Sequence, residues 1–447
     1  MNYLYLRTKY YTFLLVCLPF FGWAQNFSLP QGEKVQKVHF ELINNLIIMP
    51  IDVNGAKLSF ILDSGVNKPI LFNISDQDSV QINNVSEVTI RGLGGGEPIK
   101  ALKSKQNRFR IGKASNKNQQ LFVVLDKALN LSPSLGVPVH GIIGYDLFRD
   151  FVVEINYIKK IIKFHAPQFY KHKENKKSKT LSLIIKKNKA YVEGKIMLNK
   201  SKNVPVRLLV DTGSSDAVWL FEDQEKGLDV PKNNYEDFLG RGLSGNIFGK
   251  RTKVNSFDIG GFTLNDAKAA FPNMESFGNI KNLGNRNGSV GGEVLKRFNI
   301  VFDYSRDKVT LRKNSNFREP FHYNLAGIEL QHDGVRYIAE SIADARGVVY
   351  NDEDETFGNV QILMENRTRL SLVPEIIVSS IRAGSPAEEA GLKEGDLILA
   401  VNGKRIHKYK LQEIMKMLNE KEGKKVKVLI ERYNSDRLFT FVLKKLF

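Results

Sequence analysis

The apolar residues up to about position 315 fall into short runs, separated by turns rich in glycine, asparagine and lysine. Residues 45–51, 120–125 and 181–185 are typical of these runs. Apolar runs of four to eight residues bounded by turn residues are characteristic of strands in an all-β unit. The pattern therefore predicts a mainly β fold for this part of the chain.

The pattern changes after residue 313. Apolar positions 411, 414, 415 and 418 recur at helical spacing, whereas residues 425–432 and 437–443 alternate as paired strands do. The C-terminal part is therefore predicted to be a small α+β unit. With 447 residues, the chain is long enough for two or three domains with sizeable cores.

Two copies of one motif divide the β region. Asp63-Ser64-Gly65 and Asp211-Thr212-Gly213 each follow an apolar run and lie 148 positions apart. Further identities recur at a spacing of 147 positions, namely Gly141 with Gly288, Gly144 with Gly291, Phe151 with Phe298 and Tyr157 with Tyr304. One register that relates both halves indicates an internal duplication. Each half is predicted as a strand, an Asp turn, several strands, a Gly-x-x-Gly loop, a short helix and a closing strand pair.

A pair of aspartates in this setting has a specific chemical use. Two neighbouring carboxyl groups can share one proton, so that one stays neutral while the other deprotonates a water molecule. The glycine permits a tight turn, and the hydroxyl residue can hydrogen-bond to the partner loop. A single Asp-Ser/Thr-Gly is more often an ordinary turn. The duplication favours a catalytic pair made of Asp63 and Asp211.

These motifs resemble the two-lobed aspartic peptidases of the pepsin and retropepsin superfamily, over roughly residues 35 to 315. Residues 211–219 are particularly similar to the pepsin-type active-site segment. The resemblance implies a duplicated β-barrel fold with Asp63 and Asp211 as the dyad. It also implies support of the catalytic loops by the residues that follow each Asp, namely Ser64, Gly65, Thr212, Gly213 and Ser214.

The sequence departs from the pepsin pattern in two places. Val66 stands where the family more often has Ser, Thr or Ala, which predicts the loss of one hydrogen bond. The predicted flap, residues 91–98, contains no Tyr, and a second glycine-rich stretch lies at residues 240–246. Two flaps would suit an extended peptide held between the lobes; the alternative is two surface hairpins. The flap candidates are Gly92, Leu93, Gly94, Gly95, Gly242, Leu243 and Ser244.

The C-terminal unit strongly resembles a bacterial PDZ domain. The resemblance rests on Ser385-Pro386-Ala387, Ala390-Gly391-Leu392, Gly395-Asp396 and Asn402-Gly403. It implies binding of an extended peptide by strand addition, with a backbone nest for a C-terminal carboxylate. The nearest match to the peptide-binding loop consists of Ala326, Gly327, Ile328, Glu329 and Leu330. Glu329 would oppose a bound carboxylate if its side chain pointed inward.

An insertion is predicted within this unit around residues 331–374. It includes an acidic stretch at residues 351–355. We interpret the insertion as a solvated loop, with a hairpin or a mobile cover as the alternatives. No metal site is predicted there, because the carboxylates do not follow a calcium-loop motif.

The N-terminus predicts a targeting segment. Arg7 and Lys9 precede an apolar stretch at residues 11–21, and Ala24 offers a cleavage site, so residues 1–24 are expected to be a signal peptide. An uncleaved anchor is the alternative. Cleavage would remove Cys17, the only cysteine, and an exported chain without disulfides favours the periplasm, the cell envelope or secretion from a bacterium. No later segment is long enough to cross a bilayer.

The formal net charge is +18. A basic balance can indicate nucleic acid, anionic lipid or an acidic substrate. No nucleic-acid motif accompanies the lysines, and many lie in loops such as residues 171–180, the predicted linker between the lobes. We therefore interpret the charge as solvated surface and predict no nucleic-acid partner.

The predicted domains are lobe 1 at residues 25–170, lobe 2 at residues 181–315 and the PDZ domain at residues 320–447. The resulting hypothesis is an exported aspartic endopeptidase that binds peptide or protein substrates and PDZ ligands. It needs no cofactor and, with both motifs in one chain, no homodimer. Three alternatives stay open: a non-catalytic peptide-binding module, a structural scaffold, and a PDZ-coupled serine protease whose nucleophile loop would be residues 288–292.

Overall fold

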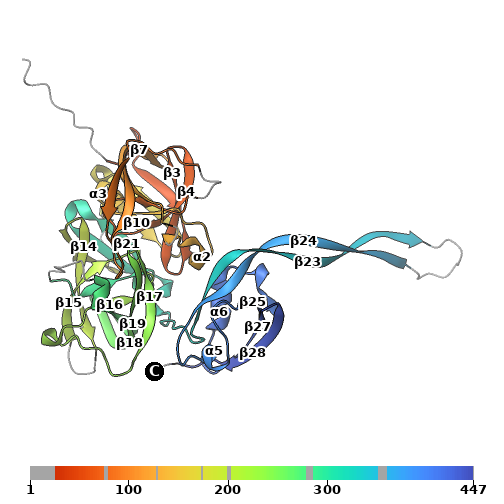
Figure 1. The fold of residues 1–447 in the computed structure, drawn as a ribbon. Helices are drawn as coiled ribbons and strands as arrows, with labels where there is room; N and C mark the ends of the chain where they lie inside the picture. Colours follow the sequence, from red (N-terminus) through yellow and green to blue (C-terminus); the bar gives the residue numbers. More distant parts are fainter. Residues whose placement is uncertain are drawn as a thin grey trace, which may run out of the picture.

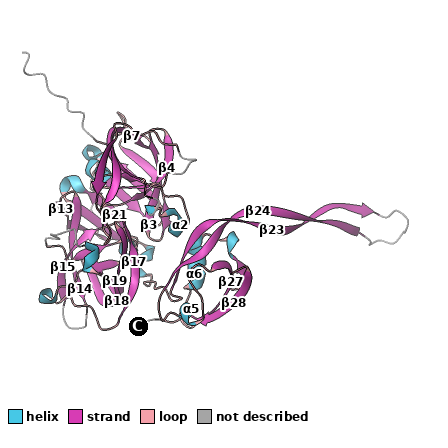
Figure 2. Ribbon diagram, viewed as in Figure 1, coloured by secondary structure: helices cyan, strands magenta, loops and turns pink. Residues whose placement is uncertain are grey.

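The computed structural model describes residues 26–74, 79–126, 129–172, 175–198, 203–277, 285–350 and 360–445. The predicted signal peptide and the acidic stretch at residues 351–355 lie outside these ranges. Figures 1 and 2 show a chain built mostly of strands: two lobes are stacked on each other, and a C-terminal domain with a long hairpin lies beside them. The predicted mainly β class is confirmed.

Lobe 1 is an eight-stranded sheet in the order β2-β3-β4-β9-β5-β8-β7-β6. A second pairing, between β3 and β7, folds this sheet back on itself. The strands are β2 (Glu41–Ile43), β3 (Leu46–Val53), β4 (Ala56–Leu62), β5 (Ile70–Leu71), β6 (Ser86–Ile90), β7 (Ile99–Ile111), β8 (Ala114–Val124) and β9 (Gly141–Ile143). The short helix α2 (Ser132–Leu135) precedes β9.

Lobe 2 repeats this order strand for strand, as β13-β14-β15-β20-β16-β19-β18-β17, with the matching second pairing between β14 and β18. The duplication read from the motif spacing is therefore also a duplication of the fold. The strands are β13 (Ile184–Lys186), β14 (Lys189–Met197), β15 (Asn203–Val210), β16 (Val218–Leu220), β17 (Asn234–Gly242), β18 (Gly245–Ile259), β19 (Phe262–Pro272) and β20 (Gly288–Val290).

A six-stranded sheet joins the lobes, in the order β1-β11-β10-β21-β22-β12. Its central contact pairs Ile155 of lobe 1 with Ile300 of lobe 2, and the rings of Phe148 and Phe302 pack edge to face at 5.2 Å beside it. The strands are β1 (Val35–His39), β10 (Val152–Asn156), β11 (Ile161–His165), β12 (Ser178–Ser182), β21 (Phe298–Asp303) and β22 (Lys308–Lys313). β12 begins inside the segment predicted as a linker.

A short helix follows each Gly-x-x-Gly loop, as the sequence predicts: α3 (Tyr145–Asp150) in lobe 1 and α4 (Gly292–Leu295) in lobe 2. Single 3₁₀ turns occupy several connections. They are η2 (Pro167–Phe169), η3 (Gln224–Lys226), η4 (Met274–Phe277), η5 (Tyr304–Arg306), η6 (Ser315–Arg318) and η7 (Ile406–Lys408).

The C-terminal domain has its own sheet, in the order β23-β24-β25-β27-β28, and its own apolar core. The helix predicted from the apolar spacing at 411–418 is α6 (Leu411–Leu418), which buries Leu411, Ile414 and Leu418. The other elements are β23 (Ile328–Tyr350), β24 (Val360–Ile381), α5 (Pro386–Glu389), β25 (Leu397–Val401), β26 (Lys404–Arg405), β27 (Lys425–Arg432) and β28 (Ser435–Val442). The predicted strand pair is thus present.

The predicted insertion forms a hairpin in its described part. β23 and β24 pair from Ile328 with Ile381 as far as Tyr350 with Val360. Figure 1 shows this ribbon reaching far beyond the rest of the domain. The solvated-loop interpretation is therefore wrong for the described residues of the insertion. The part of the chain that the structure describes contains no helix long and apolar enough to cross a membrane.

Candidate active site

The two aspartates of the repeated motif end two equivalent strands. Asp63 follows β4 and its backbone N–H donates to the carbonyl of Ile143 in β9 (2.8 Å). Asp211 follows β15 and donates in the same way to Val290 in β20 (3.0 Å). Each Asp turn is therefore held by a parallel strand pair from the interior of its lobe. The structure brings both turns to one place between the lobes.

Ser64 and Thr212 lock the two turns together. The backbone N–H of Ser64 donates to Thr212 Oγ1 (2.9 Å), and Thr212 Oγ1 donates to the carbonyl of Leu62 (2.7 Å). Reciprocally, the N–H of Thr212 donates to Ser64 Oγ (3.1 Å), which donates to Val210 (2.7 Å). Both side chains are only 1% exposed. Four buried hydrogen bonds thus fix the separation of the aspartates.

The glycines leave room for the carboxyl groups. The N–H of Gly65 donates to Asp63 Oδ1 (2.7 Å), and that of Gly213 donates to Asp211 Oδ1 (3.1 Å). A Cβ atom on Gly213 would lie 2.5 Å from Asp63 Oδ2, and one on Gly65 would lie 3.4 Å from Asp211 Oδ1. Each glycine therefore faces the carboxyl group of the other lobe, and the two carboxyl groups are neighbours.

The environment favours one proton on this pair. Burial and, next, the charge of Asp211 raise the pKa of Asp63 to about 7. Burial also raises the pKa of Asp211, while Arg286 and Lys189 oppose that rise. The hydrogen bond between the carboxyl groups raises the pKa of Asp63 and lowers that of Asp211. These interactions favour one proton on the pair and direct it toward Asp63.

Val66 does not change the shape of its turn. Its N–H donates to the carbonyl of Asp63 (3.2 Å), as the N–H of Ser214 does to Asp211 (3.3 Å). The Val66 side chain packs on a set of buried residues that we call the lobe 1 apolar cluster. This cluster consists of Ile43, Leu46, Ile48, Ile61, Ile70, Phe72, Ala101, Val124, Leu129, Leu135 and Val139.

The two predicted flaps are hairpin tips that meet each other. The N–H of Gly92 donates to Ser244 Oγ (3.1 Å), and the N–H of Ser244 donates to the carbonyl of Leu93 (2.9 Å). Leu243, from the lobe 2 tip, packs on the lobe 1 apolar cluster. Leu93, from the lobe 1 tip, packs on the lobe 2 aromatic cluster, which consists of Trp219, Phe221, Leu239, Ile247, Ala270 and Phe277. Each tip thus closes over the opposite lobe.

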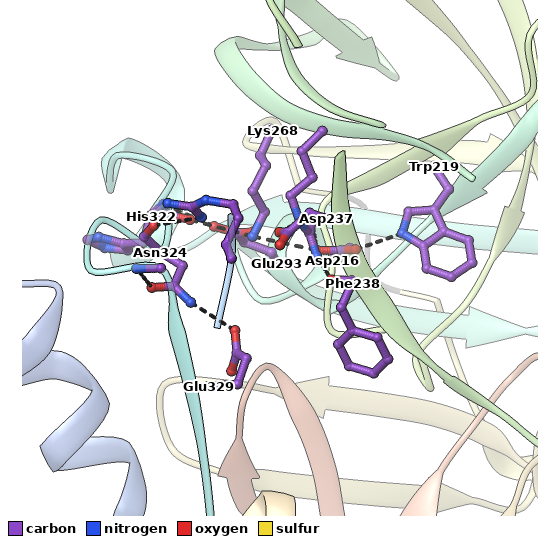
Figure 3. A network of polar contacts seen from close by, with 12 residues as sticks. Asp216, Trp219, Asp237, Phe238, Lys268, Glu293, His322, Asn324 and Glu329 are labelled. Atoms are coloured by element: carbon purple, nitrogen blue, oxygen red, sulfur yellow. Dashed lines mark hydrogen bonds and ion pairs between the residues drawn. The ribbon is translucent and has the colours of Figure 1, made fainter. Parts of the chain in front are cut away.

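A buried polar network begins at Asp216, five residues after Asp211 (Figure 3). Asp216 accepts hydrogen bonds from Trp219 Nε1 and Arg251 Nη1, both at 2.7 Å. Burial alone would raise the pKa of Asp216, but Arg251 and Lys268 hold it at about 2. Sequence reasoning missed this network. The signal was present in Asp216 and Trp219, but their cationic partners come from other strands.

The network continues to the PDZ domain. Lys268 pairs with Glu293 (2.7 Å), which accepts a hydrogen bond from the N–H of His322 (3.3 Å). Beyond it, Asn324 donates to Glu329 Oε1 (3.0 Å), and Figure 3 shows Glu329 at the end of this series. Glu329 is an exposed side chain in contact with Asn324.

The predicted PDZ carboxylate nest is filled from within the domain. The N–H groups of Leu325 and Ala326 donate to Asn419 Oδ1 (2.6 and 3.2 Å), and that of Gly327 donates to Asn324 Oδ1 (2.8 Å). A ligand carboxylate would have to replace these amide oxygens. Ile328 and Leu330 are buried in the domain core.

Lobe 1 touches the edge of the PDZ sheet. Gln412 Nε2 donates to the carbonyl of Leu135 in α2 (2.6 Å). A Cβ atom on Gly136 would lie 2.8 Å from Leu411 Cβ and 3.6 Å from His332 Cε1. β23 is the edge strand, so added peptide strands would pair there, and α2 lies against one end of that edge.

Ser289, the nucleophile of the serine-protease alternative, lies inside β20 and is 2% exposed. β20 pairs with β15 on one side and β16 on the other. This is a central strand position rather than an exposed turn. Among the described residues, no group of three or more His, Cys, Asp or Glu side chains could hold a metal ion.

Known protein families match both the two lobes and the C-terminal domain. Residues 49–147 and, again, residues 192–291 match the aspartyl protease family, and residues 377–432 match the PDZ domain family. The chain thus contains two segments that match the aspartyl protease family, followed by a PDZ domain. The predicted family resemblance is confirmed. The duplicated match divides at the same place as the two lobes.

Curated relatives cover smaller parts of the chain. The carboxy-terminal processing protease CtpA of Bacillus subtilis is 24% identical over 164 residues, which are 35% of this chain and 32% of the relative. A probable CtpA-like serine protease of Staphylococcus aureus (strain COL) is 38% identical over 63 residues, 14% of this chain and 13% of the relative. The chain therefore spans a third or less of these relatives.

Among solved structures, the aspartic proteinase from Irpex lacteus aligns with a TM-score of 0.40 and 14% identity. The alignment covers 64% of this chain and 99% of that protein.

Proposed function

We propose that this chain is an aspartic endopeptidase in which Asp63 and Asp211 form the catalytic dyad. The reciprocal bonding of Ser64 and Thr212 carries the proposal, because it holds two carboxyl groups side by side in a buried setting. A pair that shares one proton contains both the acid and the base that peptide hydrolysis requires.

Each carboxyl group has a distinct role in this mechanism. Asp211, ionised, deprotonates a water molecule that attacks the scissile carbonyl carbon. Asp63, protonated, donates a hydrogen bond to the carbonyl oxygen as negative charge develops on it. The proton that Asp211 took from the water molecule then moves to the leaving amine as the C–N bond breaks. The apparent pKa values of the reaction belong to the pair rather than to either residue.

The flaps and the PDZ domain bind the substrate in this proposal. The tips around Leu93 and Leu243 open to admit an extended peptide and close over it, which positions the scissile bond and excludes bulk water while the attacking water molecule stays at the dyad. The PDZ domain adds a peptide strand to the edge of β23, away from the end that α2 contacts. Residues 1–24 direct export of the chain to the periplasm, the envelope or the medium of a bacterial cell.

Cleavage of a denatured protein mixture across pH 3 to 8 by purified residues 25–447 tests the catalytic proposal. The expected result is cleavage that a statine-type transition-state mimic blocks and that Asp211→Asn abolishes. Gln224→Ala, at an exposed position of the η3 turn, is the matched control and should cleave normally. Retained cleavage in both Asp63→Asn and Asp211→Asn would rule out the dyad mechanism.

Two other functions predict different results. A peptide-binding module would bind the statine-type peptide and cleave nothing at any pH. A serine protease would be labelled by a fluorophosphonate probe and would lose activity in Ser289→Ala. The central position of Ser289 in β20 favours the aspartic mechanism over the serine mechanism.

A further inference from the structure

Lobe 2 places a lysine beside its catalytic aspartate. Tyr191 of β14 pairs with Leu209 of β15 in antiparallel register. The paired part of these strands ends there, and continuing its register by two positions would place Lys189 level with Asp211. Directly opposed residues of an antiparallel pair project to the same face of the sheet. The positive charge of Lys189 accordingly lowers the pKa of Asp211.

The equivalent position in lobe 1 is apolar. Ile48 of β3 pairs with Ile61 of β4, and the same extension of the register places Leu46 opposite Asp63. Leu46 belongs to the lobe 1 apolar cluster and is 8% exposed. The two halves thus carry a leucine and a lysine at one structural position.

A second pair of positions differs in the same way. His140 and Asn287 are structurally equivalent, because the side chain of each accepts a hydrogen bond from the neighbouring strand, from the N–H of Ser59 and of Arg207 respectively. The residue before each of them is therefore also equivalent. In lobe 1 it is Val139, which is fully buried in the apolar cluster. In lobe 2 it is Arg286.

Arg286 extends from this position toward the flap contact. Its Nε donates to the carbonyl of Gly288 (2.8 Å), and its guanidinium lies 5.2 Å from the ring centre of Phe221. Phe221 belongs to the lobe 2 aromatic cluster on which the flap tip residue Leu93 packs. Arg286 is therefore close both to the dyad, through Asp211, and to the flap.

The two cations have too little negative charge around them. Neither Lys189 nor Arg286 forms an ion pair with a carboxylate among the residues that the structure describes. Burial lowers the pKa of both groups, and each side chain is half-buried. A dyad with one proton carries one negative charge against two positive charges. The lobe 2 side of the dyad thus lacks one anion.

We infer that Lys189 and Arg286 bind the carboxylate of an Asp or Glu side chain of the substrate, on the lobe 2 side of the scissile bond. On the lobe 1 side, the apolar cluster that contains Leu46 and Val139, and on which the flap residue Leu243 packs, accepts an apolar side chain. Arg286 presents a planar fork that suits a carboxylate, and Lys189 adds a point charge. This inference rests on the proposed peptidase function and adds its substrate class.

Binding of uncleavable peptides tests the inference without catalysis. Two statine-type peptides that differ only by Glu or Gln at the lobe 2 position are titrated calorimetrically against residues 25–447. Wild type should bind the Glu peptide about 10- to 100-fold more tightly, as expected for a charge-assisted contact. Replacing the cations by their lobe 1 counterparts, in Lys189→Leu with Arg286→Val, should remove this difference.

Matched variants make the result specific to these two residues. Arg286→Lys should retain most of the preference. Lys57→Leu with Lys100→Val removes two exposed lysines from lobe 1 and should leave the preference unchanged. If the double lobe 2 variant does not fold, Lys189→Met and Arg286→Gln, which keep side-chain length, are titrated singly, and each should reduce the preference.

The outcomes separate this inference from the proposed function. A wild-type chain that binds both peptides equally, or a preference that survives in the folded lobe 2 variants, overturns the inference. A wild-type chain that prefers the Glu peptide but cleaves no substrate supports the binding site for an acidic side chain and contradicts the proposed peptidase activity. Cleavage next to acidic residues that shifts to neutral residues in the variants supports both.

Discussion

Lobe 1 and lobe 2 have the same strand order and the same Asp turn, yet they differ in what surrounds the turn. In lobe 1 the flanking residues belong to a continuous apolar cluster. In lobe 2 they include the cations Lys189 and Arg286 and, deeper, the ion-paired network of Asp216, Arg251 and Lys268. The backbone hydrogen bonds are common to both lobes, and the charges are not.

This difference separates two requirements of the fold. The turn needs the same glycine, hydroxyl and parallel strand pair in each lobe, because both turns must meet with matching geometry. In the proposed function the flanking side chains face a peptide substrate, which is not symmetric. A duplicated chain can therefore retain its catalytic loops while the surfaces beside them diverge.

Replacing either aspartate should have the largest effect, and it tests whether both carboxyl groups are equally required despite their different surroundings. Asp63→Asn and Asp211→Asn should each reduce the rate of peptide cleavage at least about 1000-fold, because each removes one half of an acid–base pair. Initial rates on a fluorogenic peptide measure this. A variant that keeps a tenth of the activity would show that its aspartate is not part of a dyad.

A smaller effect should distinguish the lobes at the glycines. Gly213→Ala should lower the cleavage rate about 100-fold, because the new Cβ would lie 2.5 Å from Asp63 Oδ2 and displace that carboxyl group. Gly65→Ala has more room, since the nearest atoms to its Cβ would be Asp63 Oδ1 at 3.0 Å and Asp211 Oδ1 at 3.4 Å, and it should lower the rate about tenfold. Equal losses in both variants would contradict this asymmetry.

The hydrogen bonds that Ser64 and Thr212 form between the two Asp turns should contribute equally to stability. Ser64→Ala and Thr212→Ala each remove two buried hydrogen bonds, so each should lower the free energy of unfolding by about 2 kcal/mol. Urea denaturation of both variants measures the change. Thr180→Ala, which breaks one hydrogen bond to Thr310 at 2.9 Å in the sheet between the lobes, is the control and should cost less. Markedly unequal losses for Ser64 and Thr212 would show that one turn depends on the other.

The smallest effect concerns pH. The folded chain binds a proton at Asp63 more tightly than the unfolded chain does, since burial raises the pKa of Asp63 from 3.8 to about 7. The stability that comes from this proton is complete below pH 4 and is lost as the pH rises toward 7. Asp63→Asn should therefore raise the melting temperature by about 2 °C at pH 8 and leave it unchanged at pH 4.

Cleavage by wild type should fall over the same range, with a midpoint near pH 7, as the pair loses its shared proton. Calorimetry and initial rates between pH 4 and 8 measure the two responses. A cleavage rate that keeps rising above pH 8 would contradict a shared proton on the dyad.

Local sequence was sufficient for much of the fold. The apolar spacing at 411–418 predicts α6 with its observed bounds, and the repeated glycines predict the loops before α3 and α4. The motif positions also identified Ser64 and Thr212 as residues that bond across the lobes. These features depend on periodicity or on a repeated motif, which a single sequence contains.

Other features could not be found in this way. The hairpin of β23 and β24 was only an alternative to a solvated loop, because an exposed ribbon has no strict apolar alternation. The filled carboxylate nest depends on Asn419, which lies 94 residues from Leu325. Arg251 and Lys268 pair with Asp216 from strands whose order the sequence does not encode locally.

The sequence by itself determined that this chain contains a duplicated Asp-motif fold followed by a PDZ domain, because both are specified by motifs and their spacing. The tertiary structure alone decided which charges face the dyad. Lys189 and Arg286 lie 97 positions apart and only meet beside Asp211 because β14 and β20 flank β15 in the sheet. Electrostatic interaction depends on distance in space, and that distance is set by strand order and register.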